Sequence, residues 1–446
     1  MDISQLQERL FEKGKRLGFS DMEIYYSSGR STSVKVWNKE IKGYEIREQR
    51  GVSFRGLCNN KMGYSYAEKL DDKSADFLLN AMKNAKSLEI NGVEELFGGA
   101  DHYEKLDNYS EALAELSTEA MIRWAFEMEN AALESDSRIK RVIECVVSNT
   151  CGETAIINTR GLNCRSKYAD AAGGIYVMAG DGKQTATGFE SDFTLQDVSK
   201  LNFKEIGEKA AREAVSKLGA SSIESGNYPV IFRYDTATQL LEAFVSSLSG
   251  EAVEKGFSKL EGRLGEQIAG INVTIIEDPL MKNVPGSAAF DGEGYPTRRF
   301  ELVKEGRLMT FMHNSKTARK AGTLSTGNAR KGGYRGTVNV GPHNIYLKPG
   351  SLPLEAMIEK TQKGILIVEL QGANAGINFV SGNFLLYAIG HLIDDGKLVH
   401  PVDQITVSGN IFEILSDIEE IGGDLRIRGA VAAPSLKVRA LTVSGK

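Results

Sequence analysis

Residues 33–54 read SVKVWNKEIKGYEIREQRGVSF, and this stretch decides the fold of the first half of the chain. Apolar side chains stand two positions apart in three places, which is the period of a β-strand: Val34 and Val36, Tyr44 and Ile46, and Val52 and Phe54. Turn-forming residues lie between or beside these pairs: Gly29, Asn38–Lys39, Gly51 and Asn59–Asn60. The stretch therefore predicts an antiparallel meander of short strands that turns at each of those positions.

Helical periods surround this meander. Apolar residues recur at helical spacing in several segments: residues 3–17, the region around 78–85, about 110–134 and the region after 203. Strand-like segments fill about 139–193. The first half of the chain therefore combines helices with an antiparallel sheet.

The run GASSIESG at residues 219–226 is small and polar, so we place a lobe boundary there. The sequence predicts an N-terminal α+β domain over 1–220 and a strand-rich C-terminal domain over 221–446. The second lobe opens with a strand at 228–232 and a helix whose Thr236 and Gln239 fit a capping box. Short helices are expected near 353–361 and 412–418. The fold class is therefore α+β with two lobes.

Composition excludes several classes of protein. The chain has 446 residues, 41% of them hydrophobic and 25% charged, which is typical of a globular protein. A net charge of -5 makes nucleic acid an unfavourable partner. Four cysteines are too few for a disulfide framework. The chain begins without a signal-peptide core and has no apolar run of membrane-spanning length, so we expect a cytoplasmic protein that does not enter the membrane.

Common catalytic motifs are missing from the sequence. It has no nucleotide-binding glycine loop and no Gly-x-Ser-x-Gly elbow. Ser137 and Lys140 match the loose Ser-x-x-Lys pattern, but its companion motifs are absent. No two histidines lie within one helical turn of each other, which excludes a helix-borne zinc pair.

A basic segment runs from Arg298 to Arg335. It contains ten Lys or Arg and two acidic residues, a local net charge of +8. Such a segment binds phosphate or a peptide carboxylate, or else it is a solvated face of an acidic protein. The candidate contacts to a peptide or a partner are Arg298, Arg299, Lys316 and Arg319.

Several stretches of the second lobe resemble the TldD/PmbA family, also called modulators of DNA gyrase. The matching stretches are GEAVEKG at 250–256, GRLGEQ at 262–267, FDGEG at 290–294 with TRR at 297–299, SKTAR at 315–319 with TGN at 326–328, and PVDQITVSGN at 401–410. The N-terminal helix and meander are also similar to the family. The resemblance therefore covers essentially the whole chain and implies a two-lobed α+β fold.

The catalytic motif of the family is degenerate in this chain. The TldD-like members are metallopeptidases with a His-Glu-x-x-x-His helix, which falls here on Gly250, Glu251, Glu254 and Lys255. Gly250 and Lys255 take the places of the two histidines, and only Glu251 is retained. All four cysteines precede residue 165, so the family's C-terminal cysteine ligand has no counterpart. A catalytic zinc needs about three protein ligands, and we therefore assign no catalytic residue and no metal ligand here.

The pattern resembles the PmbA-like, or TldE, half of the family. This resemblance implies a metal-free subunit that is not catalytic alone and that pairs with a zinc-bearing TldD-like subunit. The pair is associated with cleavage of unfolded peptides, including maturation of a peptide antibiotic and degradation of an antitoxin. An exposed sheet edge in the strand-rich lobe suits capture of extended peptides. Whether the isolated chain forms a homodimer stays open at this point.

Two other functions remain open at this point. An active metallopeptidase could draw an unrecognised metal site from His313, His391, Asp291 and Glu293. A regulator associated with DNA gyrase could use the basic segment to bind nucleic acid.

Overall fold

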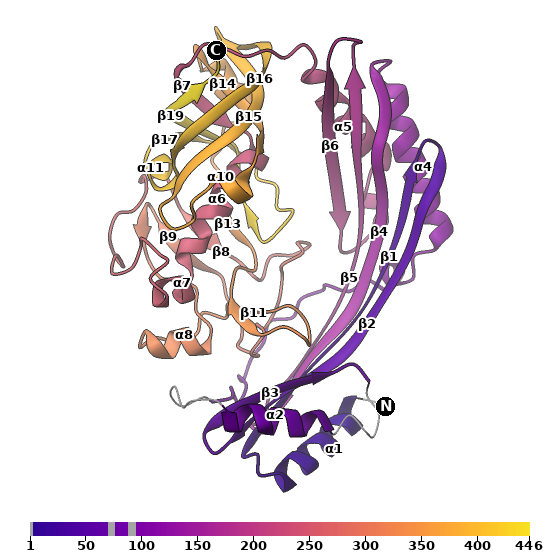
Figure 1. Cartoon of the computed structure of the whole chain (residues 1–446), viewed down its shortest axis with the longest axis vertical. Helices are drawn as coiled ribbons and strands as arrows, with labels where there is room; N and C mark the ends of the chain where they lie inside the picture. Colours follow the sequence, from indigo (N-terminus) through magenta and orange to yellow (C-terminus); the bar gives the residue numbers. More distant parts are fainter. Residues whose placement is uncertain (1–2, 70–75, 88–94) are drawn as a thin grey trace.

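The computed structural model describes residues 3–69, 76–87 and 95–446. Figure 1 shows a long curved sheet from the N-terminal half of the chain beside a strand-rich C-terminal lobe. The expected mixed α+β class is confirmed. No helix of the described residues is long and apolar enough to cross a membrane.

The first sheet is antiparallel and has the order β3-β2-β1-β4-β5-β6. Its strands are β1 (Asp21–Trp37), β2 (Glu40–Cys58), β3 (Lys61–Ala67), β4 (Ile139–Asn158), β5 (Asn163–Gly180) and β6 (Thr185–Thr194). β1 and β2 are 17 and 19 residues long, so the meander consists of long strands rather than the short ones expected.

Two of the expected turns are present and two are not. Asn38–Lys39 and Asn59–Asn60 adopt left-handed backbone with φ between 53° and 59°, as tight hairpin turns require. Gly29 and Gly51 instead lie inside continuous strands. A Cβ on Gly51 would lie 2.5 Å from the ring of Tyr334, so this glycine makes room for another segment rather than turning the chain.

Helices cover one face of the first sheet. They are α1 (Ile3–Arg16), α2 (Asp76–Ser87), α3 (Glu111–Ala114), α4 (Thr118–Ser135) and α5 (Phe203–Ser216). α4 and α5 pack on the sheet at one end, while α1 and α2 lie at the other end (Figure 1). The long helix expected over 110–134 is broken, because the Ser117 side chain accepts a hydrogen bond from Ala120 N and starts α4.

The two faces of β1 have different neighbours because successive side chains of a strand alternate. Met22, Ile24, Val34 and Val36 are buried in the helix-covered cores. Tyr25 points to the opposite face and lines a cavity shared with the C-terminal lobe. The odd-numbered side chains of this part of β1 therefore take part in the contact between the two lobes.

The C-terminal lobe contains two larger sheets and a two-stranded ribbon. One sheet has the order β16-β15-β14-β7-β19-β17, with β7 (Gly226–Phe232), β14 (Lys363–Gln371), β15 (Asn383–Asp394), β16 (Lys397–Asn410), β17 (Ile418–Ile421) and β19 (Leu436–Ser444). The other has the order β10-β9-β8-β13-β18, with β8 (Ile275–Glu277), β9 (Phe300–Lys304), β10 (Arg307–Leu308), β13 (Ile345–Leu347) and β18 (Val431–Ala432). The ribbon pairs β11 (Ala329–Lys331) with β12 (Val338–Val340).

Short helices complete this lobe: α6 (Tyr234–Val245), α7 (Gly250–Glu254), α8 (Ser315–Lys320), α9 (Leu354–Glu359), α10 (Ala373–Gly376) and α11 (Ile411–Ser416). α9 and α11 match the two short helices expected from the sequence. The capping box expected at Thr236 is absent, because α6 begins two residues earlier at Tyr234. The Thr236 hydroxyl instead donates to Arg233 O and to Ile367 O.

Sheet edges differ between the two lobes. β16 pairs with β15 on one side and with β19 on the other, so the larger C-terminal sheet closes on itself at Thr406–Ser408. Residues 40–50 of β2 pair only with β1, among the residues that the structure describes. The strand-rich lobe still has the edge strands β10, β17 and β18, so the free edge expected there is present, and β2 adds another in the first sheet. We keep residue 220 as the proposed domain boundary, since the strands of the first sheet end with β6.

Candidate functional site

The degenerate motif lies on α7, a single short helical turn. The Ser249 side chain accepts a hydrogen bond from Glu251 N at 3.2 Å and starts the helix. Gly250 N donates to Met312 O at 2.8 Å, which ties the turn to the neighbouring chain segment. Lys255 is the C-cap, and Gly256 follows with a φ of 69°. The helix thus ends between the two positions that carry histidine in the family motif.

Gly250 packs directly against the ring of His313. A Cβ added at Gly250 would lie 2.4 Å from His313 Nδ1, far inside van der Waals contact. His313 is buried, and its Nδ1 lies 3.2 Å from Thr317 Oγ1. The space that a side chain at position 250 would need is therefore filled by another residue.

The retained carboxylate of the motif is neutralised within its own helix. Lys255 Nζ lies 2.6 Å from Glu251 Oε1, and this contact lowers the pKa of Glu251. Glu254 forms an ion pair with Lys320 of α8. Because its side chain is held by a cation, Glu251 is not free to activate water, and the motif does not fit a zinc site.

The basic residues expected at the site divide into two groups. Lys316 and Arg319 lie on α8, which packs beside α7. Arg319 lines a cavity of about 390 Å³ together with Tyr295 and residues 95–98. Arg298 and Arg299 are exposed at the start of β9, where Arg299 lies 3.5 Å from Asp278. Among the described residues, neither Arg298 nor Arg299 forms a hydrogen bond or ion pair with α7.

The alternative metal site is not assembled. Both carboxylate oxygens of Asp291 accept backbone N–H groups, and Glu293 Oε2 accepts from Ser315 N at 2.8 Å. His391 lies on β15 near the charges of Arg233, while His313 packs on Gly250. Within residues 3–69, 76–87 and 95–446, no three His, Cys, Asp or Glu side chains are grouped to hold a metal ion.

The segment around β11 joins the two lobes. Lys331 Nζ donates to Ser53 Oγ at 2.7 Å and lies 4.2 Å from the centre of the Tyr25 ring. Tyr64 donates its hydroxyl hydrogen to Tyr334 O at 2.7 Å. Burial lowers the pKa of Lys331 to about 7, with a further contribution from Arg55. Part of the basic segment is thus used for lobe-to-lobe contact rather than for a solvated face.

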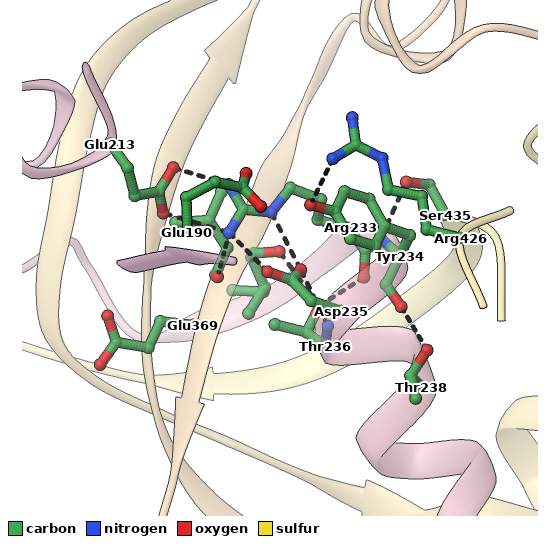
Figure 2. A network of polar contacts seen from close by, with 12 residues as sticks. Glu190, Glu213, Arg233, Tyr234, Asp235, Thr236, Thr238, Glu369, Arg426 and Ser435 are labelled. Atoms are coloured by element: carbon green, nitrogen blue, oxygen red, sulfur yellow. Dashed lines mark hydrogen bonds and ion pairs between the residues drawn. The ribbon is translucent and has the colours of Figure 1, made fainter. Parts of the chain in front are cut away.

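A second contact between the lobes is centred on Arg233 (Figure 2). Arg233 Nη1 lies 2.8 Å from Glu213 Oε2 of α5, and its Nε lies 2.9 Å from Asp235 Oδ1. Lys217 Nζ lies 3.2 Å from Glu213 and 2.7 Å from Glu369. Burial opposes ionisation of Glu213, but Arg233 and Lys217 together lower its pKa. This cluster balances each buried cation with at least one carboxylate.

Sequence reasoning missed both of these clusters. The sequence indicates Arg330 and Lys331 only as members of a basic segment, and no pattern marks Arg233. The Ser53 partner of Lys331 and the Val368 partner of Arg233 lie more than a hundred residues away in the chain, so no spacing rule connects them. Gly51 was the available signal, because a glycine inside a strand marks a close approach of another segment.

Comparisons with known proteins agree across the whole chain. Models of the PmbA/TldA metallopeptidase match as domain 1 over residues 22–87, as the central domain over 111–218 and as the C-terminal domain over 225–445. A Buchnera aphidicola protein named a metalloprotease PmbA homologue is 25% identical over 96% of this chain and 93% of its own.

Solved structures show the same arrangement. A Thermotoga maritima protein described as a modulator of DNA gyrase superposes with a TM-score of 0.92 at 30% identity, covering 99% of this chain and 100% of its own. TldE from Thermococcus kodakarensis has the same fold, with a TM-score of 0.89 at 23% identity and coverage of 99% and 100%. The chain therefore belongs to the PmbA/TldD family of metallopeptidase-like proteins.

Proposed function

We propose that this chain is a PmbA/TldE-like subunit that binds no metal and is not catalytic alone. It would help to enclose unfolded peptides for cleavage by a TldD-like partner that carries the zinc. The observation that carries the proposal is the pairing of Gly250 with the His313 ring, because it removes both a ligand and the space for one.

The surroundings of α7 support a role in holding peptide. The cavity of about 390 Å³ beside α8 is lined by Tyr295, Leu324 and Arg319, which offer apolar surface and a cation. An extended peptide could place its apolar side chains against the apolar surface of this cavity and a main-chain carbonyl group near the cation. The candidate contacts Lys316 and Arg319 are thus placed beside the degenerate motif rather than within it.

Co-purification tests the partnership. The full chain, tagged and isolated from its own cells, is expected to bring a protein with an intact His-Glu-x-x-x-His motif. Elemental analysis is expected to find zinc in that protein alone, and peptidase activity is expected only in the mixture. Peptide hydrolysis by the purified single chain, lost in Glu251→Gln, would reject the proposal.

A restoration experiment tests the misfit of the metal. The double variant Gly250→His and Lys255→His regains the motif in sequence, but a side chain at 250 meets the His313 ring. We expect no stoichiometric zinc after dialysis, with Lys255→His alone as the matched control. Stoichiometric zinc in the double variant would show that the site relaxes to accept a metal.

The alternative of an independent metallopeptidase is not favoured. Its proposed ligands are engaged in separate places, with Asp291 bonded to backbone N–H groups and His391 in the C-terminal sheet. A regulator of DNA gyrase is also not favoured, because Lys331 is directed into the lobe contact.

A further inference from the structure

A cavity of about 260 Å³ lies between the first sheet and the C-terminal lobe, away from the degenerate motif. Tyr25, Ser166 and Tyr168 line it from the sheet, and Arg330 and His343 line it from the other lobe. It is separate from the cavity beside α8, with which it shares no lining residue. Its walls are therefore built by both lobes.

Arg330 is the unusual member of this wall. Its side chain is exposed to solvent although it lies in the contact between the lobes. Arg330 Nη1 lies 2.8 Å from His343 Nδ1, and no ion pair of Arg330 with a carboxylate is found among the described residues. A guanidinium has five N–H donors, so the donors that do not contact His343 are available to a ligand in the cavity that Arg330 lines.

His343 holds the guanidinium without neutralising it. His343 Nε2 lies 2.9 Å from Gly327 O, which fixes the hydrogen on Nε2 because a carbonyl only accepts. Burial, reinforced by Arg330, lowers the pKa of His343 to about 3, so the ring is neutral. Nδ1 then accepts a hydrogen bond from Arg330. The imidazole orients the side chain without bringing a negative charge into contact with it.

The other charged groups of the wall are already engaged. Asp291 Oδ1 accepts from Glu293 N at 2.9 Å and from Tyr295 N at 3.0 Å, and its Oδ2 accepts from Ala329 N at 3.0 Å. Lys331 donates to Ser53 and lies over the Tyr25 ring. Arg330 is thus the cation in this wall that still has donors to offer, within the part of the chain that the structure describes.

We propose that this inter-lobe cavity binds a carboxylate-bearing ligand and that Arg330 anchors its carboxylate. The planar guanidinium fork matches two carboxylate oxygens at once, which gives both strength and orientation. The hydroxyl groups of Ser166 and Tyr168 on the opposite wall can bond the remaining polar atoms. The cavity lies just below the usual range of about 300–1,000 Å³ for ligand sites. It therefore accepts a small acid or the C-terminal end of a peptide.

This site adds a ligand class to the proposed function. The carboxylate site rests on the proposed function in one respect only, which is that the carboxylate would come from the C-terminal end of a peptide. Binding by the purified chain needs no partner and no peptidase activity, so failure of the partnership and failure of this site are separate results.

Calorimetric titration of the full chain tests the ligand class. Tri-alanine with a free C-terminus, its C-terminal amide, acetate and inorganic phosphate are titrated separately. We expect the free acid to bind at least about tenfold more tightly than the amide, since a charge-assisted pair is lost in the amide. Acetate as tight as tri-alanine supports the carboxylate site and identifies a small acid as its ligand. Equal binding of the amide, or binding of phosphate without either acid, overturns the proposal.

Variants on opposite walls test the place of binding. Arg330→Gln is expected to weaken tri-alanine binding by about 10–100-fold, as removal of a charged hydrogen-bond partner does. Ser166→Leu fills the cavity from the sheet side while Arg330 stays in place, and it should also abolish binding. Arg439→Gln, an exposed arginine on β19, is the matched control. Thermal melting checks the fold of each variant, and if Arg330→Gln does not fold, Ser166→Leu decides. Wild-type affinity in the folded variants rejects the site.

Discussion

Arg233 and Arg330 both lie where the two lobes meet, but their surroundings differ. Arg233 is held by Glu213 and Asp235, with the Val368 carbonyl as a further acceptor (Figure 2). Arg330 bonds to the neutral ring of His343 and, among the described residues, to no carboxylate. An arginine paired with carboxylates, such as Arg233, holds the lobes together. An arginine without a carboxylate partner in a cavity, such as Arg330, has N–H donors left for a ligand.

The carboxylates of the two regions show the same contrast. Glu213 has its pKa lowered because Arg233 and Lys217 outweigh its burial. Burial raises the pKa of Glu277, which lies behind Arg330, to about 7. Its Oε1 accepts from His343 N, and its Oε2 has no hydrogen-bond partner. In this region, both the Arg330 guanidinium and the Glu277 carboxyl group therefore have hydrogen-bonding capacity that no protein group fills among the described residues.

The largest effect is expected from Arg233→Met. This change leaves the Glu213 carboxylate without its two guanidinium bonds in a partly buried place. Loss of one partner of such a pair costs about 3–5 kcal/mol of unfolding free energy. Urea denaturation measures it, with Arg439→Met as the exposed control. A loss no greater than that of the control would show that the Arg233 cluster does not hold the lobes.

Glu277→Gln is expected to change the pH dependence of stability. The folded-state pKa of about 7 lies above the unfolded value of about 4.3. The stability contributed by the protonated group is therefore complete below the unfolded pKa and is lost as pH rises through 7. Glu277→Gln keeps an oxygen that accepts hydrogen bonds but has no ionisable group at this position.

The wild type should accordingly lose about 1–3 kcal/mol more than Glu277→Gln between pH 4.5 and pH 8. Urea denaturation at several pH values measures the difference. Glu359→Gln, an exposed change on α9, should follow the wild type. Parallel curves for all three proteins would contradict the assignment of the raised pKa.

Arg330→Gln should affect stability much less than Arg233→Met. No carboxylate loses a direct partner, and the main loss is one hydrogen bond to His343 of about 1 kcal/mol. The same urea titration measures it. A loss as large as that of Arg233→Met would erase the distinction between the two arginines.

The smallest effect is expected from Glu251→Gln. It removes an ion pair with Lys255 at the protein surface, where water and salt screen the charges. Thermal melting at low and high salt should place the variant close to the wild type. A large loss would mean that the motif glutamate keeps a role that its ion pair does not explain.

Local patterns predicted the secondary structure well where the signal was local. The Asn38–Lys39 and Asn59–Asn60 turns form because both residues of each pair adopt left-handed backbone. The pattern failed at Gly29 and Gly51, where the competing cause is the approach of Tyr168 and Tyr334. Such contacts depend on tertiary structure and leave no period in the sequence.

The candidate site was predicted only in part, because some of its contacts also depend on tertiary structure. Family resemblance located α7 and the exchange of both histidines. It did not reveal that His313 fills the space beside Gly250 or that Glu254 reaches Lys320. These contacts join α7 to a segment some sixty residues later, so only the folded chain displays them.

The free edge of β2 has a consequence for solubility. Its backbone groups over residues 40–50 are a template for indiscriminate strand pairing, and Ile41, Tyr44 and Ile46 add exposed apolar surface there. Glu45, Arg47, Glu48 and Arg50 stand along the same stretch, and an unrelated strand that docks must strip water from them. The charged residues thereby act as gatekeepers against aggregation while the edge itself stays open.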